Sequence, residues 1–381
     1  MRIPLLDLKA QHAAIRAEVE AAVKAVFDDQ QFVLGATVER FEEEMRAYTG
    51  AAHAIGVASG SDALLLALLA LEIGPQDAVV TTPFTFFATA GSIVRAGARL
   101  LFGDIDPATF NLAPESVAAV LRDAAREARR VVLMPVHLYG RLAPMSALSL
   151  LAAEHGAAIV EDAAQAIGAR AATERGSRMA GTFGLFGALS FFPSKNLGAA
   201  GDAGMVLCEE EEMAHRVRLL RTHGSLRRYV HDRVGVNSRL DALQAAVLSV
   251  KLKHLETWNR ARRERAAAYE RRLRDAGLDR QGVVLPELAG EEHVFHQFVI
   301  RVERRDQLRE ALAEAGVETQ VYYPVPLHRQ PCFADLGFRD GDFPQAERVC
   351  RECLALPIFP ELSDDQIDYV VETIAAFHRA R

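Results

Sequence analysis

Cysteine is scarce in this sequence, with four residues in 381. So few thiols do not make a disulfide framework in a chain of this length, so we expect a reducing compartment. Long apolar runs are also missing: the longest, from Ala63 to Leu71, is far shorter than the roughly 20 residues of a membrane span. Asp7 and Lys9 interrupt the first apolar stretch, which does not fit a secretory signal peptide. We therefore expect a soluble, cytoplasmic protein that does not enter a membrane.

Several motifs of well-known sites are absent as well. The sequence contains neither G-x-x-x-x-G-K-[ST] nor G-x-G-x-x-G, so P-loop and dinucleotide sites find no support. His293 and His296 lack the H-E-x-x-H arrangement of metalloproteases. Cys350 and Cys353 have C-x-x-C spacing, but there is no second pair, and the surrounding pattern from Gln345 to Leu354 is helical. The sequence therefore predicts no metal site.

A strong excess of one charge is also missing. Lys and Arg total 44 against 51 Asp and Glu, which gives a formal charge of −7. This mildly acidic balance excludes a protein that coats nucleic acid, so we expect small molecules or proteins as partners. Apolar residues make up 50% and charged residues 25%, the balance of a globular protein with a sizeable core.

From about residue 50 to 210, short β-rich apolar runs alternate with helical stretches. This alternation is typical of an α/β fold with a mostly parallel sheet. The helical stretches, including 61–72, 116–130, 144–155 and 210–220, are expected to cover the faces of that sheet. The seven predicted strands are Ala54–Ala58, Ala78–Thr82, Arg99–Asp104, Val131–Val136, Ala157–Glu161, Ala188–Phe192 and Gly204–Cys208.

The pattern changes after Asn237. A helix without Gly or Pro is predicted from about 240 to 276, and it would link two domains. We expect a large domain over 1–250 and a small α+β domain over 251–381, since about 150 residues per domain favours one large and one smaller unit. The small domain would contain a strand at 295–302, a helix at 305–315 and two closing helices.

Three stretches carry chemistry. IGVASGSDAL (55–64) runs from a strand through a small turn into a helix, whose exposed N–H groups would bind a phosphate. Alternatively, Ser61 only caps the helix.

IVEDAAQ (159–165) puts Asp162 at the carboxyl end of an apolar strand, where open α/β sheets bind ligands. The alternative is that Asp162 caps the next helix. LSFFPSKNLG (189–198) puts Lys195 after a buried strand, where a neutral amine able to attack a carbonyl is favoured over an ordinary surface lysine.

With these stretches in hand, the sequence resembles the DegT/DnrJ/EryC1/StrS family of sugar aminotransferases over nearly its whole length. The resemblance rests on EDAAQ (161–165) and SFFPSKNLG (190–198). It extends to TPFTFFATA (82–90), DPATFNL (106–112), PVHLYG (135–140) and GVNSRLDALQAA (235–246). It implies the fold type I architecture of the aspartate-aminotransferase class and the cofactor pyridoxal 5′-phosphate (PLP).

The resemblance also implies roles for single residues. Lys195 matches the lysine that holds PLP as a Schiff base and moves the proton between substrate and cofactor, and Asp162 matches the carboxylate paired with the pyridine nitrogen. An anion there keeps that nitrogen protonated and the ring an electron sink. The other residues that match cofactor-binding positions are Gly60, Ser61 and Ser190 around the phosphate, Phe86 on the ring, Gln165 near the phenolic oxygen, and Asn237 from a neighbouring subunit.

Because Asn237 matches a residue supplied by the partner, the resemblance implies a homodimer with shared active sites. It further implies glutamate as amino donor and a keto nucleotide-linked sugar as acceptor, with the segments 235–246 and 322–331 favouring a 3-keto over a 4-keto sugar. Such reactions make amino or deoxyamino sugars for surface polysaccharides or glycosylated metabolites. Tyr322 and His328 lie in a segment that resembles one near the substrate pocket of the family.

Arg239 is a further candidate for substrate binding. In an extended turn, residues 237 and 239 share one side of the chain, so Arg239 would reach the shared pocket and bind an anionic group. The cluster of Arg227, Arg228, Tyr229 and His231 is either a solvated loop or an anion clamp.

Two alternatives to amino transfer stay open: a PLP-dependent sugar dehydratase or lyase on the same scaffold, and a silent regulatory homologue that keeps the ligand. Family members that act as dehydratases have His at the position of Lys195, and intact Lys195 and Asp162 argue against a silent protein.

Overall fold

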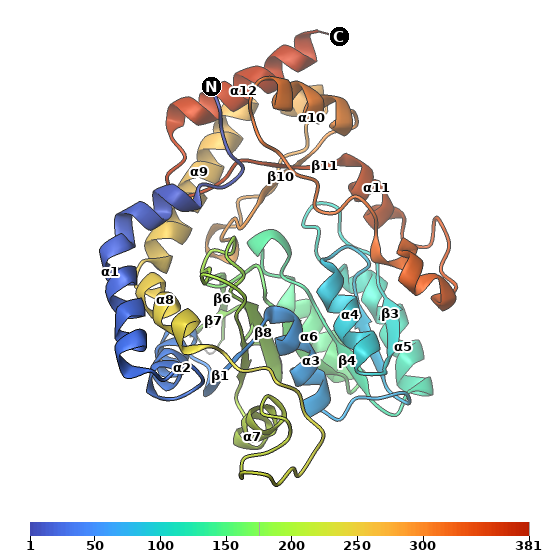
Figure 1. Ribbon diagram of the computed structural model, residues 1–381. Coiled ribbons are helices and arrows are strands. Elements are labelled where there is room, and N and C mark those ends of the chain that lie inside the picture. The colour runs from blue at the N-terminus through green and yellow to red at the C-terminus, as the bar shows by residue number, and fades with distance from the viewer. Residues whose placement is uncertain (175, 381) are drawn as a thin grey trace.

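The protein is built around a seven-stranded sheet, as seen in the computed structural model, which describes residues 1–174 and 176–380 (Figure 1). All seven predicted strands are present, with ends shifted by a few residues. Their bounds are β1 His53–Val57, β2 Ala78–Thr81, β3 Arg99–Phe102, β4 Val131–Leu133, β5 Ala158–Asp162, β8 Phe186–Ser190 and β9 Gly204–Cys208.

The sheet is mostly parallel. The strand order is β1-β9-β8-β5-β4-β2-β3, and the pairs from β3 through β2, β4 and β5 to β8 are all parallel. Only β9 runs against its neighbours β8 and β1. The predicted α/β fold class is therefore confirmed, and the carboxyl ends of β5 and β8 lie side by side at one edge of the sheet.

Helices cover both faces of this sheet, as predicted. The side chains of each strand alternate between two cores: Val79 points to one and Val80 to the other. One core is completed by α3 (Gly60–Ala70), α4 (Phe87–Arg95) and α7 (Glu211–Leu220). The other is completed by α2 (Ala36–Thr49), α5 (Pro114–Glu127), α6 (Met145–Glu154) and α8 (Ala242–Leu252).

The single helix predicted over 240–276 is wrong. The structure has two helices there, α8 and α9 (Leu255–Asp275), separated by Lys253 and His254. The His254 N–H donates to the Lys251 carbonyl oxygen at 3.0 Å, a tighter turn than that of an α-helix. On the two sides of this break the helices have different neighbours: α8 packs against α2 and α1 (Leu8–Asp29), whereas α9 packs against α12 (Asp364–Arg379). This change of neighbours supports our proposal that the large domain ends near residue 250.

The carboxy-terminal part carries a two-stranded antiparallel sheet of β10 (Phe298–Arg301) and β11 (Cys353–Leu356). The helices α10 (Arg305–Glu314), α11 (Pro344–Glu352) and α12 accompany it, and Figure 1 shows α10 and α12 above the large sheet. A hairpin of β6 (Arg170–Thr173) and β7 (Gly176–Met179) precedes β8. Short 3₁₀ turns lie at Leu138–Gly140, Asp279–Gln281, Gly290–Glu292, Leu327–Arg329 and Pro331–Leu336.

The C-x-x-C pair is divided between two elements. Cys350 lies on α11, while Cys353 opens β11, so the predicted helical stretch ends earlier than Leu354. All four cysteines are free. In the part of the chain that the structure describes, no group of three or more His, Cys, Asp or Glu side chains could hold a metal ion. Within the same residues, no helix is both long enough and apolar enough to cross a membrane.

Candidate functional site

A cavity of about 460 Å³ opens at the carboxyl ends of β5 and β8. The start of α3, the start of α4 and residues 296–297 and 322–323 close it. Its volume is that of a small-molecule site. Most of the predicted site residues line it together: Gly60, Ser61, Phe86, Asp162, Gln165, Ser190, Lys195 and Tyr322.

Asp162 ends β5 and is almost fully buried. Its Oδ2 accepts a hydrogen bond from the Thr89 hydroxyl at 2.7 Å, and its Oδ1 accepts one from the Ala164 N–H at 3.2 Å. Burial raises the pKa of Asp162 above that of an ordinary carboxyl group, although these two hydrogen bonds oppose the shift. An ionised Asp162 is therefore oriented by its neighbours but needs a positive charge beside it.

The neighbouring Glu161 fixes the end of β5 through hydrogen bonds. Its carboxylate is fully buried, accepts hydrogen bonds from the backbone N–H groups of Gly181, Phe183 and Gly184, and lies 2.8 Å from His137 Nε2. The Ala143 N–H donates to His137 Nδ1 at 3.0 Å, so Nε2 must carry the hydrogen that faces Glu161. This network holds the backbone that carries Asp162.

Lys195 follows β8 by a short turn and lies in the same cavity as Asp162. Burial lowers the pKa of the Lys195 ammonium to about 8, against the opposing attraction of Asp162. Near pH 7 roughly a tenth of this side chain is thus an uncharged amine, the form that attacks a carbonyl carbon.

The start of α3 lines the cavity, and a helix N-terminus suits an anionic group such as a phosphate. Ser59, and not Ser61, is the N-cap, because its Oγ accepts a hydrogen bond from the Asp62 N–H at 3.1 Å. Ser61 is therefore free to use its hydroxyl on a ligand together with the N–H groups of the first turn. Gly60 lies so close to Ser190 that an added Cβ would come within 2.6 Å of the serine Cβ. The glycine thus lets the helix approach β8.

Phe86 and Gln165 form other parts of the wall. The Phe86 ring is 55% exposed, with its centroid 6.1 Å from that of Tyr323. A flat ligand ring could therefore stack on it. Gln165 is fixed at both ends of its amide: its Oε1 accepts from the Tyr139 N–H at 2.7 Å, and its Nε2 donates to the Tyr323 hydroxyl at 3.3 Å.

Three predicted residues do not line this cavity. Asn237 is exposed and pairs with Thr222, while Arg239 is partly buried and makes no ion pair among the residues described. His328 is buried, with Nε2 3.1 Å from Glu347 Oε1. The predicted contact of His328 with substrate therefore does not fit this structure, because Glu347 engages the ring inside the small domain.

Sequence reasoning missed several residues of the wall. Thr85, Asp202, Gln297, Tyr323 and His296 also line the cavity. His296 is mentioned in the sequence analysis only because it does not form a metalloprotease motif, and Gln297 belongs to no motif there. Their segment precedes β10, far from Lys195 in the chain, so no local pattern could have joined them.

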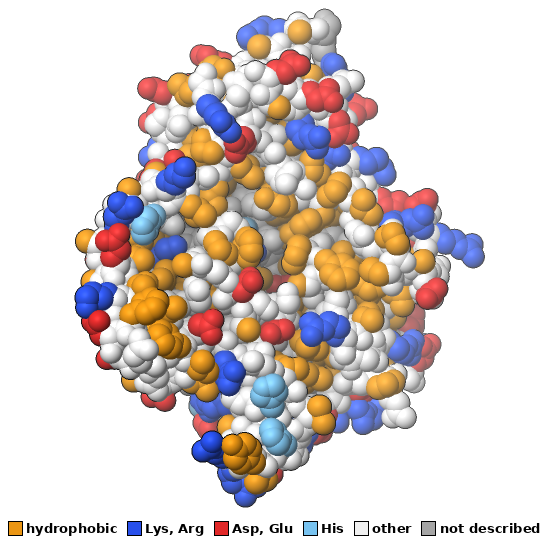
Figure 2. All heavy atoms as spheres, in the orientation of Figure 1, with side chains coloured by type: hydrophobic (Ala, Val, Ile, Leu, Met, Phe, Trp, Pro, Cys, Tyr) orange, Lys and Arg blue, Asp and Glu red, His pale blue; other side chains and the backbone are white. Residues whose placement is uncertain are grey.

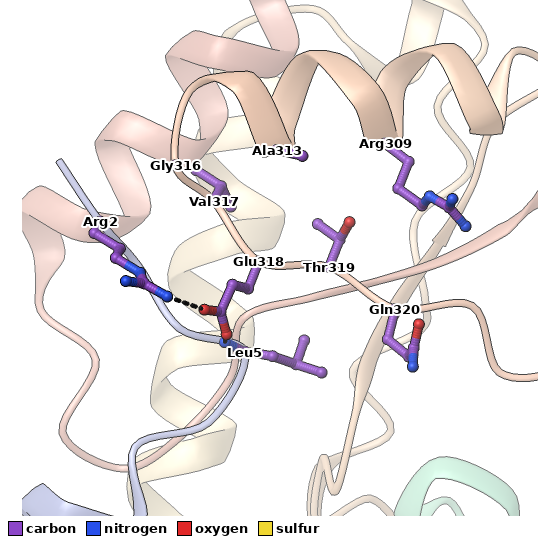
Figure 3. A pocket seen from close by; sticks show the side chains of 9 residues that line it. All are labelled: Arg2, Leu5, Arg309, Ala313, Gly316, Val317, Glu318, Thr319 and Gln320. Carbon is purple, nitrogen blue, oxygen red and sulfur yellow. Dashed lines mark hydrogen bonds and ion pairs between the residues drawn. The ribbon is translucent and has the colours of Figure 1, made fainter.

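A larger hollow of about 710 Å³ lies elsewhere, between the amino-terminal segment and α10 (Figure 3). An ion pair of Arg2 with Glu318 crosses it, and Arg309 and Gln320 also line it. It includes none of the predicted site residues. The smaller cavity remains the candidate site because half-buried Lys195 and buried Asp162 both line it.

Comparison with known proteins agrees with this geometry. Residues 13–375 match the DegT/DnrJ/EryC1/StrS aminotransferase family. A "Pleiotropic regulatory protein" of Geobacillus stearothermophilus is 47% identical over 100% of this chain and 99% of its own. A UDP-N-acetyl-3-dehydro-alpha-D-glucosamine 3-aminotransferase of Acidithiobacillus ferrooxidans is 43% identical over 98% and 97%. A crystal structure of DesV from S. venezuelae superposes with a TM-score of 0.92 at 42% identity, covering 99% of this chain and 98% of that one.

Proposed function

The chain belongs to the DegT/DnrJ/EryC1/StrS aminotransferase family, and we propose that it moves the amino group of glutamate to the 3-keto group of a nucleotide-linked sugar. It is a PLP-dependent aminotransferase. The observation that carries the proposal is that half-buried Lys195 and buried Asp162 line one cavity. The 3-keto position is supported by the name of the Acidithiobacillus relative, a 3-aminotransferase.

The residues of the cavity fit PLP. A phosphate matches the donors at the start of α3 and Ser190, which Gly60 lets approach each other closely. A protonated pyridine nitrogen supplies the positive charge that buried Asp162 needs, and Phe86 offers a ring face. When bound, the cofactor supplies an electron sink and the carbon that carries the amino group between the two substrates.

The remaining chemistry falls to the side chains of this chain. In our proposal, the uncharged Lys195 amine would hold the cofactor covalently until the amino group of the substrate displaces it. The released amine would then take the proton from the substrate carbon that bears nitrogen, and in the second half-reaction it would deliver a proton to the corresponding carbon of the sugar. Asp162 would keep the pyridine nitrogen protonated, and Gln165, whose amide is held by the Tyr139 N–H and the Tyr323 hydroxyl, would lie near the phenolic oxygen.

The test is incubation with glutamate and a panel of UDP- and dTDP-linked keto sugars, with detection of products by mass spectrometry. We expect an aminated 3-keto sugar and one 2-oxoglutarate for each, and neither with Lys195→Ala. Loss of water from the sugar without 2-oxoglutarate would favour the dehydratase or lyase. Absence of any product would favour a silent regulatory homologue. The Geobacillus relative is named a regulatory protein, so this alternative is included in the test. Since the reaction needs glutamate and nucleotide sugars together, we expect it in the cytoplasm.

The pKa of Lys195 leads to a prediction about cofactor loading. Only the uncharged amine reacts with an aldehyde, so the rate of PLP attachment to the apoprotein should rise as the pH increases through about 8 and then level off. Stopped-flow absorbance follows the reaction, with a free lysine derivative as control for titration of PLP itself. If the rate of attachment rose only near pH 10.4, the pKa of an ordinary lysine, the lowered pKa of Lys195 would be contradicted.

A homodimer with shared sites is part of the proposal. Asn237 is exposed and lies outside the cavity of its own chain, which is what a residue that serves a second copy requires. Nearby, Tyr229 is 82% and Val234 96% exposed. Figure 2 shows hydrophobic, His and Lys/Arg side chains together at the lower end of the molecule, where Figure 1 shows the segment after α7. Exposed apolar groups of this kind favour coverage by another chain.

Subunit mixing tests the sharing. Lys195→Ala and Asn237→Ala proteins are mixed so that they exchange subunits. The PLP concentration is one at which each variant alone is largely inactive. In a mixed dimer one site then has both defects and the other has neither, so about one quarter of wild-type activity should return after random exchange. No recovery after exchange proven by mass spectrometry would sink the shared site, since separate sites would each keep one defect.

Arg239 is proposed to bind an anionic group of donor or acceptor in that shared pocket. Lys195 is the one Lys or Arg among the cavity's described lining residues, which include Asp162 and Asp202, yet both substrates are anionic. Arg239→Ala should therefore raise KM for one substrate by about 10- to 100-fold with kcat little changed, the cost of one charge-assisted hydrogen bond. Arg239→Lys should restore little, because it lacks the planar fork. Separate half-reactions identify the substrate, and unchanged kinetics in both would make Arg239 a structural neighbour.

A further inference from the structure

His296 lies in the wall of the cavity that holds Lys195 and also borders a smaller cavity of about 50 Å³ behind it. It precedes β10, and Arg262 Nη1 on α9 donates to its carbonyl oxygen and to that of Phe295. The backbone at His296 is thus held by a buried guanidinium, which fixes the place of the ring.

Two buried amides determine which ring nitrogen carries the hydrogen. Asn259 Nδ2 donates to the Ile167 carbonyl at 3.1 Å, so Asn259 Oδ1 is an acceptor. Asn196 Nδ2 donates to that oxygen at 2.8 Å and to the Val294 carbonyl at 3.1 Å. The atom of the Asn196 amide that faces His296 is therefore its oxygen, which lies 3.2 Å from His296 Nδ1. Since an amide oxygen only accepts, Nδ1 carries the hydrogen and Nε2 is a bare lone pair.

The surroundings keep this ring uncharged. Burial lowers the pKa of His296 well below that of an ordinary histidine, and the positive charges of Lys195 and Arg262 act in the same direction. Nε2 has no hydrogen-bond partner within residues 1–174 and 176–380. His296 thus presents a hydrogen-bond acceptor without a donor of its own.

The chemistry of the two substrates decides which one this acceptor suits. The two carboxylates of glutamate are acceptors only, and its single donor group is the nitrogen that is transferred. A keto sugar instead carries hydroxyl groups, and some carry an amide N–H. We propose that His296 Nε2 selects the sugar by accepting a hydrogen bond from one of these groups, an inference that rests on the proposed function.

The test uses His296→Phe, which keeps a flat ring without the acceptor, and His296→Gln, whose side-chain oxygen can replace it. Each half-reaction of the holoenzyme is measured alone. In His296→Phe we expect KM for the keto sugar to rise about tenfold or more, with the glutamate half-reaction within about twofold of wild type. His296→Gln should recover part of the loss. His293→Gln, in the same segment but outside the cavity, is the matched control and should leave the KM for sugar unchanged.

Sugars that lack single hydroxyl groups identify the donor. One deoxy sugar should be a poor substrate for the wild type but equal to its parent in His296→Phe. Independently of activity, ¹⁵N NMR of histidine-labelled protein, assigned with His296→Phe, should show Nδ1 protonated and Nε2 bare.

Three results would overturn the inference: a hydrogen on Nε2, unchanged KM for sugar in a folded His296→Phe protein, or a glutamate half-reaction slowed as much as that of the sugar. The last would mean that His296 acts on Lys195. If the wild type accepts amino groups from glutamate but converts no keto sugar, the proposed function itself fails, and this inference fails with it.

Discussion

Replacing Lys195 with alanine is expected to lower turnover by on the order of 10⁴-fold, because one side chain supplies both the covalent attachment and the proton transfer. The variant should still bind PLP, but without the covalent link. Borohydride reduction followed by peptide mapping should find the cofactor on Lys195 in the wild type and on no lysine in the variant. Absorbance of the bound cofactor and the rate of amino-sugar formation measure the two losses separately.

Lys251 provides the matched control. It is also partly buried and burial also lowers its pKa, but its Nζ donates to the Gly198 carbonyl at 2.6 Å and it does not line the cavity. Lys251→Ala should therefore keep cofactor attachment and most of the activity. Reduced cofactor mapped to Lys251, Lys24 or any other lysine would overturn the assignment of Lys195.

Asp162→Asn is expected to keep the fold and bind PLP but lose at least about a hundredfold in turnover. An amide has the same shape and can keep the hydrogen bond with the Thr89 hydroxyl, yet it carries no charge to hold the pyridine nitrogen protonated. The loss should appear in kcat of both half-reactions, since both need the electron sink. Steady-state kinetics at saturating PLP measure it.

A cofactor analogue separates the effect of the Asp162 charge from any structural effect of the substitution. PLP methylated on its pyridine nitrogen keeps a permanent positive charge, so it should raise the activity of Asp162→Asn and give no gain with the wild type. Thr89→Val is the control for orientation, because it removes one hydrogen bond to the carboxylate but leaves the charge. Near-wild-type activity of Asp162→Asn with ordinary PLP would mean that another acid does this work.

Lys195 and Asp162 could be found from the sequence because Asp162 ends an apolar strand and Lys195 comes a few residues after another. Strand ends are local features, and parallel strands bring their carboxyl ends to the same edge of a sheet. The same argument found the seven strands. The resemblance to a family added the roles of Gly60, Phe86 and Gln165, which lie in the cavity.

Other parts of the site depend on segments far apart in the chain. His137 and Glu161 meet across two strand ends, and His296 reaches Asn196 over 100 residues. Neither histidine lies in a local pattern that names its partner. His328 shows the reverse case, since a promising motif puts its ring against Glu347 and not in the cavity.

The sequence by itself determined the fold class, the strands, and the position of a lysine and a carboxylate near neighbouring strand ends, because these follow from local alternation of apolar and polar residues. Only the tertiary structure decided the break between α8 and α9, which no glycine or proline marks. It also decided the tautomer of His296 and left Asn237 outside its own cavity. Such features arise from packing and hydrogen bonds between distant segments, and local propensity does not contain them.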